Sequence, residues 1–284
     1  CYNMSAGIRM RNSNIEMDGV LDVYSNRVGI DSIDSGLTFD RFICQYNKEA
    51  GIKARNSHIY YGKNSFDAAN QDATGALLIA GLDAIPYDQG CGYFGNGKHL
   101  DLTNSYYEPV IREDMVGTHR NNIFYGCNGS KKPFTETYVM GQSGIVLHNS
   151  KADFLNTRMA QGKCGLGSQN VYSLDYNFAD YIPLPTEGVL VNANSNSNVS
   201  FIGTRFNPTI LTGDVATTNK NNTGVYASNN STIKFSGPTA VYHFGTGVHV
   251  DSGSVLDVSP QTENGILDFS SYSLSNGGNH TSFE

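Results

Sequence analysis

Residues 7–17 of the chain read "GIRMRNSNIEM", residues 51–61 read "GIKARNSHIYY" and residues 144–154 read "GIVLHNSKADF". Each stretch begins with glycine, alternates between apolar and polar residues, reaches Asn-Ser and then alternates again. Alternation with a period of two is typical of a β-strand that has one buried face. The stretch therefore predicts two short strands joined by a corner, and the chain uses this unit repeatedly.

Glycines followed by alternating residues recur at a nearly constant spacing. From Gly7 to Gly97 the steps are 22, 22, 24 and 22 residues, and the series resumes at Gly144. An antiparallel sandwich would not keep one strand phase and one corner chemistry at such a step. A parallel β-helix does, because about 20 to 25 residues carry a chain once around a small cross-section built from strands and corners.

The two corners of the repeat are expected to have different chemistry. The proposed asparagine corners are Asn12, Asn56, Asn149 and Asn230. The next inward residue lies three positions after each of them, which predicts a corner of fixed length. Asparagine tolerates the left-handed backbone region, and its amide can hydrogen-bond to an asparagine in the next layer, about 4.8 Å away. Glycine with positive φ is expected at the opposite corner. The proposed glycine corners are Gly7, Gly51, Gly144 and Gly224.

These repeats resemble the right-handed parallel β-helices of phage tail spikes, fibres and baseplate proteins, and those of bacterial surface adhesins. The resemblance covers residues 7 to about 268. The repeat itself predicts an all-β fold, a single-stranded parallel β-helix (solenoid) with coils of about 22 residues and loop insertions near 106–140 and 168–187. The resemblance implies that this β-helix is right-handed. Residues 1–284 are expected to form one β-helix domain, either an ordered part of a longer chain or a subunit capped by its neighbours.

Charge and hydropathy argue against two classes of partner. The 284 residues include 19 Lys plus Arg and 26 Asp plus Glu, a net charge of -7, which does not provide a broad basic surface for nucleic acid or anionic lipid. The apolar run at residues 76–80 is far too short to span a bilayer. We therefore expect neither nucleic-acid binding nor membrane insertion.

The cysteines and histidines do not form a recognisable metal or redox motif. The five cysteines are widely spaced without a CxxC pair, so we expect free thiols, and the seven histidines lack HxH and HExxH spacing. The stretch "GKCGLG" at 162–167 lacks the spacing of a phosphate-binding loop. We expect no metal and no cofactor. His99 lies in the turn-like stretch 95–101, and we expect it to be exposed.

The segment 106–120 contains the best candidates for catalysis, since Glu108, Glu113 and Asp114 gather carboxylates in one expected insertion. Glycoside hydrolysis needs two carboxyl groups held at a suitable separation across the sugar bond. The alternative, which we favour, is a solvated loop whose acids are balanced by neighbouring arginines. These three residues are catalytic candidates only if the protein is an enzyme.

Tyrosines are the candidates for binding. Tyr106 and Tyr107, and Tyr176 and Tyr181 in the second expected insertion, offer ring faces and hydroxyls to a sugar or a receptor. Packing against the rod or contact with another subunit would use the same side chains.

The favoured interpretation is a structural or adhesive virion protein of a phage tail, a fibre, spike or baseplate component. Such a rigid rod presents loops to other virion subunits, in a homotrimer or another symmetric oligomer, and to a host surface glycan or receptor. It would assemble in the host cytoplasm and work in host attachment on the virion. Two alternatives stay open: a carbohydrate-active, tail-spike-like glycosidase or lyase, and a bacterial surface adhesin or secreted passenger domain at the cell surface.

Overall fold

The structure is a computed structural model. It describes residues 4–45, 47–61, 91–94, 96–110, 122–125, 144–155, 158–160, 164–165, 188–202, 204–207, 210–211, 219–236, 239–241, 244–258 and 267–268. Every regular element in these ranges is a β-strand, and none of them is a helix. The all-β class expected from the sequence is confirmed for this part of the chain.

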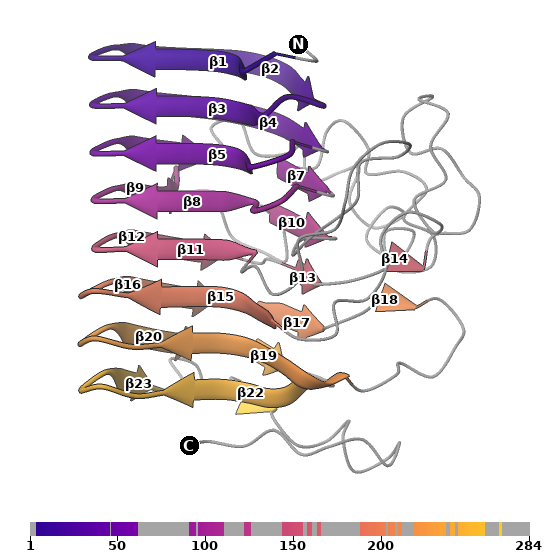
Figure 1. The fold of residues 1–284 in the computed structure, drawn as a ribbon, viewed down its shortest axis with the longest axis vertical. Helices are drawn as coiled ribbons and strands as arrows, with labels where there is room; N and C mark the ends of the chain where they lie inside the picture. The colour runs from indigo at the N-terminus through magenta and orange to yellow at the C-terminus, as the bar shows by residue number, and fades with distance from the viewer. Residues whose placement is uncertain are drawn as a thin grey trace.

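An eight-stranded parallel sheet forms one side of the molecule (Figure 1). Its strands follow one another in chain order: β1 (Ala6–Arg11), β3 (Val28–Ile33), β5 (Ala50–Arg55), β8 (Leu100–Thr103), β11 (Ile145–His148), β15 (Gly188–Asn194), β19 (Asn219–Ala227) and β22 (Phe244–Val250). Each strand is followed in the chain by strands of the second sheet. Parallel neighbours are joined in this way because a tight hairpin cannot connect them.

A fourteen-stranded parallel sheet contains two rows that meet at the long strands β2 (Asn14–Tyr24) and β4 (Gly36–Gln45). The first half of β4 pairs with β6 and its second half pairs with β7. The first row continues through β6 (His58–Tyr61), β9 (Tyr106–Pro109), β12 (Lys151–Leu155), β16 (Asn198–Ile202), β20 (Thr232–Ser236) and β23 (Val255–Asp257). The second row continues through β7 (Cys91–Phe94), β10 (Asn122–Tyr125), β13 (Arg158–Ala160), β17 (Arg205–Asn207), β21 (Thr239–Val241) and β24 (Leu267–Asp268).

We call one strand of the eight-stranded sheet, together with the strands that follow it in the two rows, a layer. A separate two-stranded sheet consists of β14 (Cys164–Gly165) and β18 (Ile210–Leu211). All strand pairs in the three sheets are parallel. Layers therefore stack at the strand spacing of about 4.8 Å.

The core is built from side chains that occupy the same register position in successive layers. One inward position of the eight-stranded sheet is filled by Ile8, Ile30, Ile52, Leu100, Ile145, Val191, Val225 and Val248. All but Ile8, in the first layer, are buried. The prediction that Ile8, Ile52 and Ile145 share one face is confirmed. Burial of these branched apolar chains is the main force that holds the layers together.

Aromatic rings stack along the first row inside the same core. The ring centroid of Phe201 lies 5.4 Å from that of Phe154 and 5.3 Å from that of Phe235, with interplanar angles of 12° and 20°. All three side chains are at most 1% exposed. Their register follows from the parallel pairing of β12, β16 and β20, which puts identical residue types one above another.

The expectation of positive φ at the glycine corners is wrong. Gly7, Gly51 and Gly224 lie within strands and Gly144 precedes β11. Among the described glycines only Gly253 has positive φ. The need for glycine is steric instead: a Cβ on Gly51 would lie 2.8 Å from the carbonyl oxygen of His99, and one on Gly224 would lie 2.6 Å from that of Gly247. Glycine thus permits close approach of the next layer's backbone.

The first expected insertion starts later than predicted. Residues 106–109 form β9, which pairs with β6 and β12 inside the first row, so this part of the 106–140 range belongs to the stack. The alternation of exposed Tyr106 and buried Tyr107 provides the inward side chain that the layer needs. The second expected insertion, 168–187, lies outside the described residues.

Candidate functional site

Asparagines at the bend between the eight-stranded sheet and the first row form a ladder. Asn12, Asn56, Asn104 and Asn149 have φ values of 49, 50, 49 and 48°. Nδ2 of Asn149 donates to Oδ1 of Asn104 (2.8 Å), Nδ2 of Asn104 donates to Oδ1 of Asn56 (3.2 Å), and Nδ2 of Asn56 donates to Oδ1 of Asp34 (3.0 Å). The amides thereby join consecutive layers, as the corner chemistry predicted.

A second ladder runs through the serine that follows each of these residues. The backbone N–H of Ser57 donates to Oγ of Ser105 (3.1 Å), that of Ser105 donates to Oγ of Ser150 (3.0 Å), and that of Ser150 donates to Oγ of Ser197 (3.1 Å). Each of these four serines is buried. Sequence reasoning used Asn-Ser only as a corner marker and missed this role. The signal was the serine that follows asparagine in all three quoted stretches.

At the bend between the eight-stranded sheet and the first row, each of the first five layers has one residue with positive φ, whereas each of the last three layers has two. The paired residues with positive φ are Ser195 and Asn196, Asn229 and Asn230, and Ser252 and Gly253. The expected spacing of three positions from each proposed asparagine to the next inward residue is confirmed, but the bend as a whole gains one residue before the asparagine in the later layers, so its total length is not fixed. The change falls between Asn149 and Asn196, and within the described residues the amide ladder ends at Asn149.

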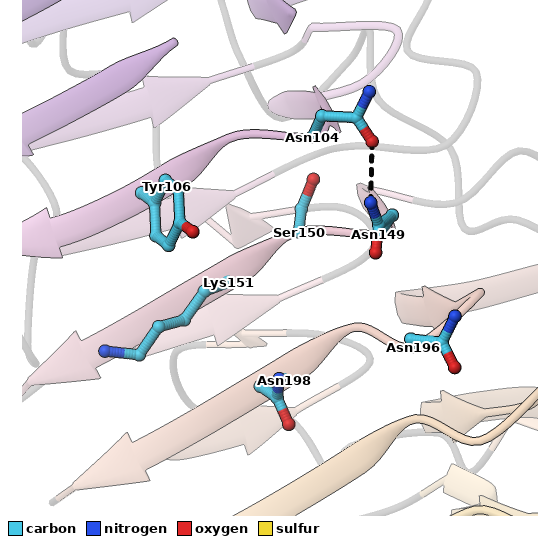
Figure 2. A pocket seen from close by; sticks show the side chains of 7 residues that line it. All are labelled: Asn104, Tyr106, Asn149, Ser150, Lys151, Asn196 and Asn198. Carbon is cyan, nitrogen blue, oxygen red and sulfur yellow. Dashed lines mark hydrogen bonds between the residues drawn. The ribbon is translucent and has the colours of Figure 1, made fainter. Parts of the chain in front are cut away.

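A shallow pocket lies at the end of this ladder, with a volume of about 260 Å³. Its lining residues are Asn104, Tyr106, Asn149, Ser150, Lys151, Asn196 and Asn198. Figure 2 shows Asn104 and Asn149 joined by their hydrogen bond, whereas Asn196 lies apart from them. Tyr106, Lys151 and Asn198 come from the successive strands β9, β12 and β16, so the pocket spans three layers.

An aromatic cluster borders the pocket on the outward face of β6 and β9. The side chain of Tyr106 is 48% exposed, and its ring centroid lies 4.8 Å from the imidazole of His58. Tyr60, which is 36% exposed, stacks on His58 at 4.1 Å. Of these side chains Tyr106 lines the pocket and Tyr60 does not, so one exposed ring face lies beside the polar depression.

Of the other tyrosines proposed for binding, Tyr107 belongs to the core. Its side chain is fully buried, stacks on Tyr61 at a centroid distance of 4.7 Å and shares a hydrogen bond with the hydroxyl of Tyr93 (3.0 Å). Such contacts serve packing, and the ring is inaccessible to a ligand. Tyr176 and Tyr181 lie outside the described residues.

Glu108 lies in a network of ion pairs beside the cluster. Its carboxylate is 2.6 Å from Nζ of Lys151 and 2.9 Å from Nε2 of His58, and Lys151 also contacts Asp153 at 2.8 Å. Partial burial raises the pKa of Glu108, but hydrogen bonds from Lys151 and His58 outweigh it and hold the pKa below the ordinary value. Hydrogen bonds to Asp153 and Glu108 raise the pKa of Lys151.

This network does not suit Glu108 to act as a general acid. A glycosidase acid must carry its proton near the working pH, which requires a raised pKa. The lowered pKa of Glu108 keeps it ionised. The other two carboxylates proposed for catalysis, Glu113 and Asp114, lie outside the described residues.

A buried asparagine ladder supports a different bend and includes His99. The backbone N–H of Asn26 donates to Oδ1 of Asn47 (3.0 Å), and that of Asn47 donates to Oδ1 of Asn96 (2.9 Å). His99 is fully buried beside Asn96, so the expectation that His99 is exposed is wrong. Burial lowers the pKa of His99 to about 3. Cys44 is a buried free thiol, and burial raises its pKa, which makes this thiol unreactive.

In the described part of the chain, no group of three or more His, Cys, Asp or Glu side chains could hold a metal ion. None of the described elements is a helix with the length and hydropathy needed to cross a membrane.

Comparison of the chain with protein-family models, curated proteins and solved structures found no match. The stacked layers, the two bend ladders and the pocket with its aromatic border are therefore the basis for inferring function.

Proposed function

We propose that the chain is a right-handed parallel β-helix that serves as a structural and adhesive component of a phage tail, in a fibre, spike or baseplate. One observation carries the proposal: a single inward register position passes without interruption from Ile8 in β1 to Val248 in β22. Such a stack is a quasi-one-dimensional body whose stability comes from contacts between neighbouring layers.

The path of the chain supports the helical winding. From β1 it enters β2, whose two halves belong to the two rows of the larger sheet, and it then returns to the eight-stranded sheet as β3. One passage through the eight-stranded sheet and the two rows of the larger sheet thus brings the chain back beside its starting strand. Right-handed winding is the expected sense, because connections between parallel strands of one sheet are right-handed in about 98% of cases.

The bend ladders support a mechanical role. The serine ladder pairs buried backbone N–H groups at the corners, and the asparagine ladder joins exposed amides. Corners that are hydrogen-bonded between layers open less readily than ordinary loops, in which the backbone is solvated. A rod of this kind maintains a fixed distance between its ends and presents its sides to other subunits or to a receptor.

The charge network of Glu108 supports a binding role over a catalytic one. Its carboxylate, which has a lowered pKa, is engaged by Lys151 and His58. Within the described residues, the exposed ring of Tyr106 borders an amide-lined depression and not a pair of carboxyl groups with separated pKa values.

Immunogold electron microscopy with antibodies against the chain tests the proposal. Particles and cells from a host culture that expresses the sequence would be labelled together. Gold on virion tails supports the proposal, whereas gold only on the bacterial envelope would identify a surface adhesin. A parallel incubation of the purified chain with host polysaccharide should release no reducing ends; their appearance would establish an enzyme instead.

A further inference from the structure

We propose that the pocket at the end of the asparagine ladder binds an uncharged saccharide through Tyr106, Asn149, Asn196 and Asn198. The inference rests on the proposed adhesive function and names the ligand class and the site. Four features of the pocket support it: exposed amide groups without a protein partner among the described residues, an adjacent exposed ring, a described lining without aliphatic side chains, and a compensated lysine.

The lengthened bend leaves amide groups without partners. Asn149 donates through Nδ2 to Asn104, but within the described residues its Oδ1 accepts no hydrogen bond. The side-chain amides of Asn196 and Asn198 make no hydrogen bond in the same part of the chain, although both line the pocket. A carboxamide offers one acceptor and two donors, which matches a hydroxyl group that both donates and accepts. Vicinal sugar hydroxyls would satisfy several of these amides together.

Tyr106 supplies the apolar contact that a sugar ring needs. Its ring is 48% exposed and is held by the imidazole of His58 at 4.8 Å, so it is presented with a restricted orientation. The C–H face of a pyranose packs on such a ring while its hydroxyls stay hydrogen-bonded. In the part of the chain that the structure describes, no aliphatic side chain lines the pocket. A protein partner would need a buried apolar anchor there, and the pocket does not offer one.

Local charge favours an uncharged ligand. Among the described residues, Lys151 is the only cation that lines the pocket, and its Nζ lies 2.6 Å from Glu108 and 2.8 Å from Asp153. Two carboxylates therefore compensate one ammonium group. An acidic sugar or a phosphate that approached the remaining N–H of Lys151 would meet the repulsion of both carboxylates.

A glycan array carrying neutral and acidic oligosaccharides tests the inference. The fluorescently labelled chain should be retained on neutral glycans. Tyr106→Ala should weaken this binding about tenfold through loss of the ring face, and Asn149→Ala about three- to tenfold through loss of hydrogen bonds. Matched controls are Tyr60→Ala, an exposed ring that stacks on the same imidazole outside the pocket, and Asn12→Ala, a bend asparagine with φ of 49° in the first layer. Both controls should bind like the wild type.

Three results would overturn the inference: an array without signal, retention on acidic glycans only, or equal losses in a pocket variant and its matched control. None of them would affect the proposed scaffold, which is tested by the immunogold labelling of virion tails. Conversely, neutral-glycan binding by a chain that labels only cell envelopes would retain the saccharide site and refute the tail function. Circular dichroism of each variant confirms that loss of binding is not loss of fold.

Discussion

The backbone N–H of Ser57 donates a hydrogen bond of 3.1 Å to Oγ of Ser105, a residue 48 positions further along the chain. Oγ of Ser105 in turn donates to the carbonyl oxygen of Thr103 (2.8 Å). One buried hydroxyl therefore closes its own bend and binds the bend of the preceding layer. The same arrangement recurs at Ser150, which joins the local turn to the stack of layers.

Replacing Ser105 by alanine should destabilise the chain by about 1–3 kcal/mol, because the buried N–H of Ser57 loses its acceptor. Ser13→Ala is the matched control. Ser13 is exposed, and within the described residues its Oγ makes a single hydrogen bond, to the carbonyl oxygen of Arg11, so the change should cost less than about 0.5 kcal/mol. Urea unfolding monitored by circular dichroism measures both. Equal costs would show that the ladder does not stabilise the corners.

Truncation of Phe201 to alanine should cost about 3–5 kcal/mol, since it empties the middle of the aromatic stack between Phe154 and Phe235. Ile202→Ala, next in the same strand but 40% exposed, should cost about 0.5 kcal/mol. The midpoint of urea unfolding reports the difference. Comparable costs at the two positions would place Phe201 outside the core.

Glu108 should stabilise the fold only while it is ionised. Its pKa is lowered in the folded state, so its contribution is fully present above the ordinary pKa of 4.5 and is lost as the pH falls through the folded value. Glu108→Gln should therefore reduce the free energy of unfolding at pH 7, and the gap to the wild type should narrow below pH 4.5. Urea titrations at several pH values test this. A gap that widens on acidification would contradict the ion pairs with Lys151 and His58.

His99 should make the fold sensitive to acid. Burial lowers its pKa from 6.5 to about 3, so between these values the unfolded state binds the proton that the folded state excludes. The free energy of unfolding should then fall with decreasing pH across this window, by up to about 1.4 kcal/mol per pH unit from this residue. His99→Gln should remove that part of the slope, whatever its effect at pH 7. Identical slopes would show that His99 is accessible to protons.

The repeat period and the alternation were sufficient to predict the stacking of Ile8, Ile52 and Ile145, because burial of one face fixes the register of a strand. The inward position of Tyr107 could have been predicted from the same pattern. It follows Ser105 by two positions, as Ile59 follows Ser57, and it pairs with Ile59 in the structure. His99 stands in this repeat where Gly51 stands in the other, and without a glycine at its start the repeat was not recognised as equivalent.

The pocket could not be predicted in the same way. The run "NANSNSN" at 192–198 has asparagine at every second position, so alternation does not show which residue bends. The pair Ser195 and Asn196 takes the left-handed conformation, and this single extra residue ends the amide ladder at Asn149. The burial of His99 was also hidden, because a turn-like sequence does not show which neighbouring bends pack over it.

Spin-label distances along the first row test the central claim, the parallel stacking of layers, most directly. Glu16 and Lys234 are 218 residues apart in sequence, and both point outward from the first row, six layers apart. With the five native cysteines replaced by alanine, labels at these positions should be about 29 Å apart, and labels at Thr38 and Lys234 about 24 Å apart, at about 4.8 Å per layer. The distance from Thr38 to Lys234 should be shorter than the distance from Glu16 to Lys234 by about one strand spacing. A different result would contradict the stacked structure and the functions inferred from it.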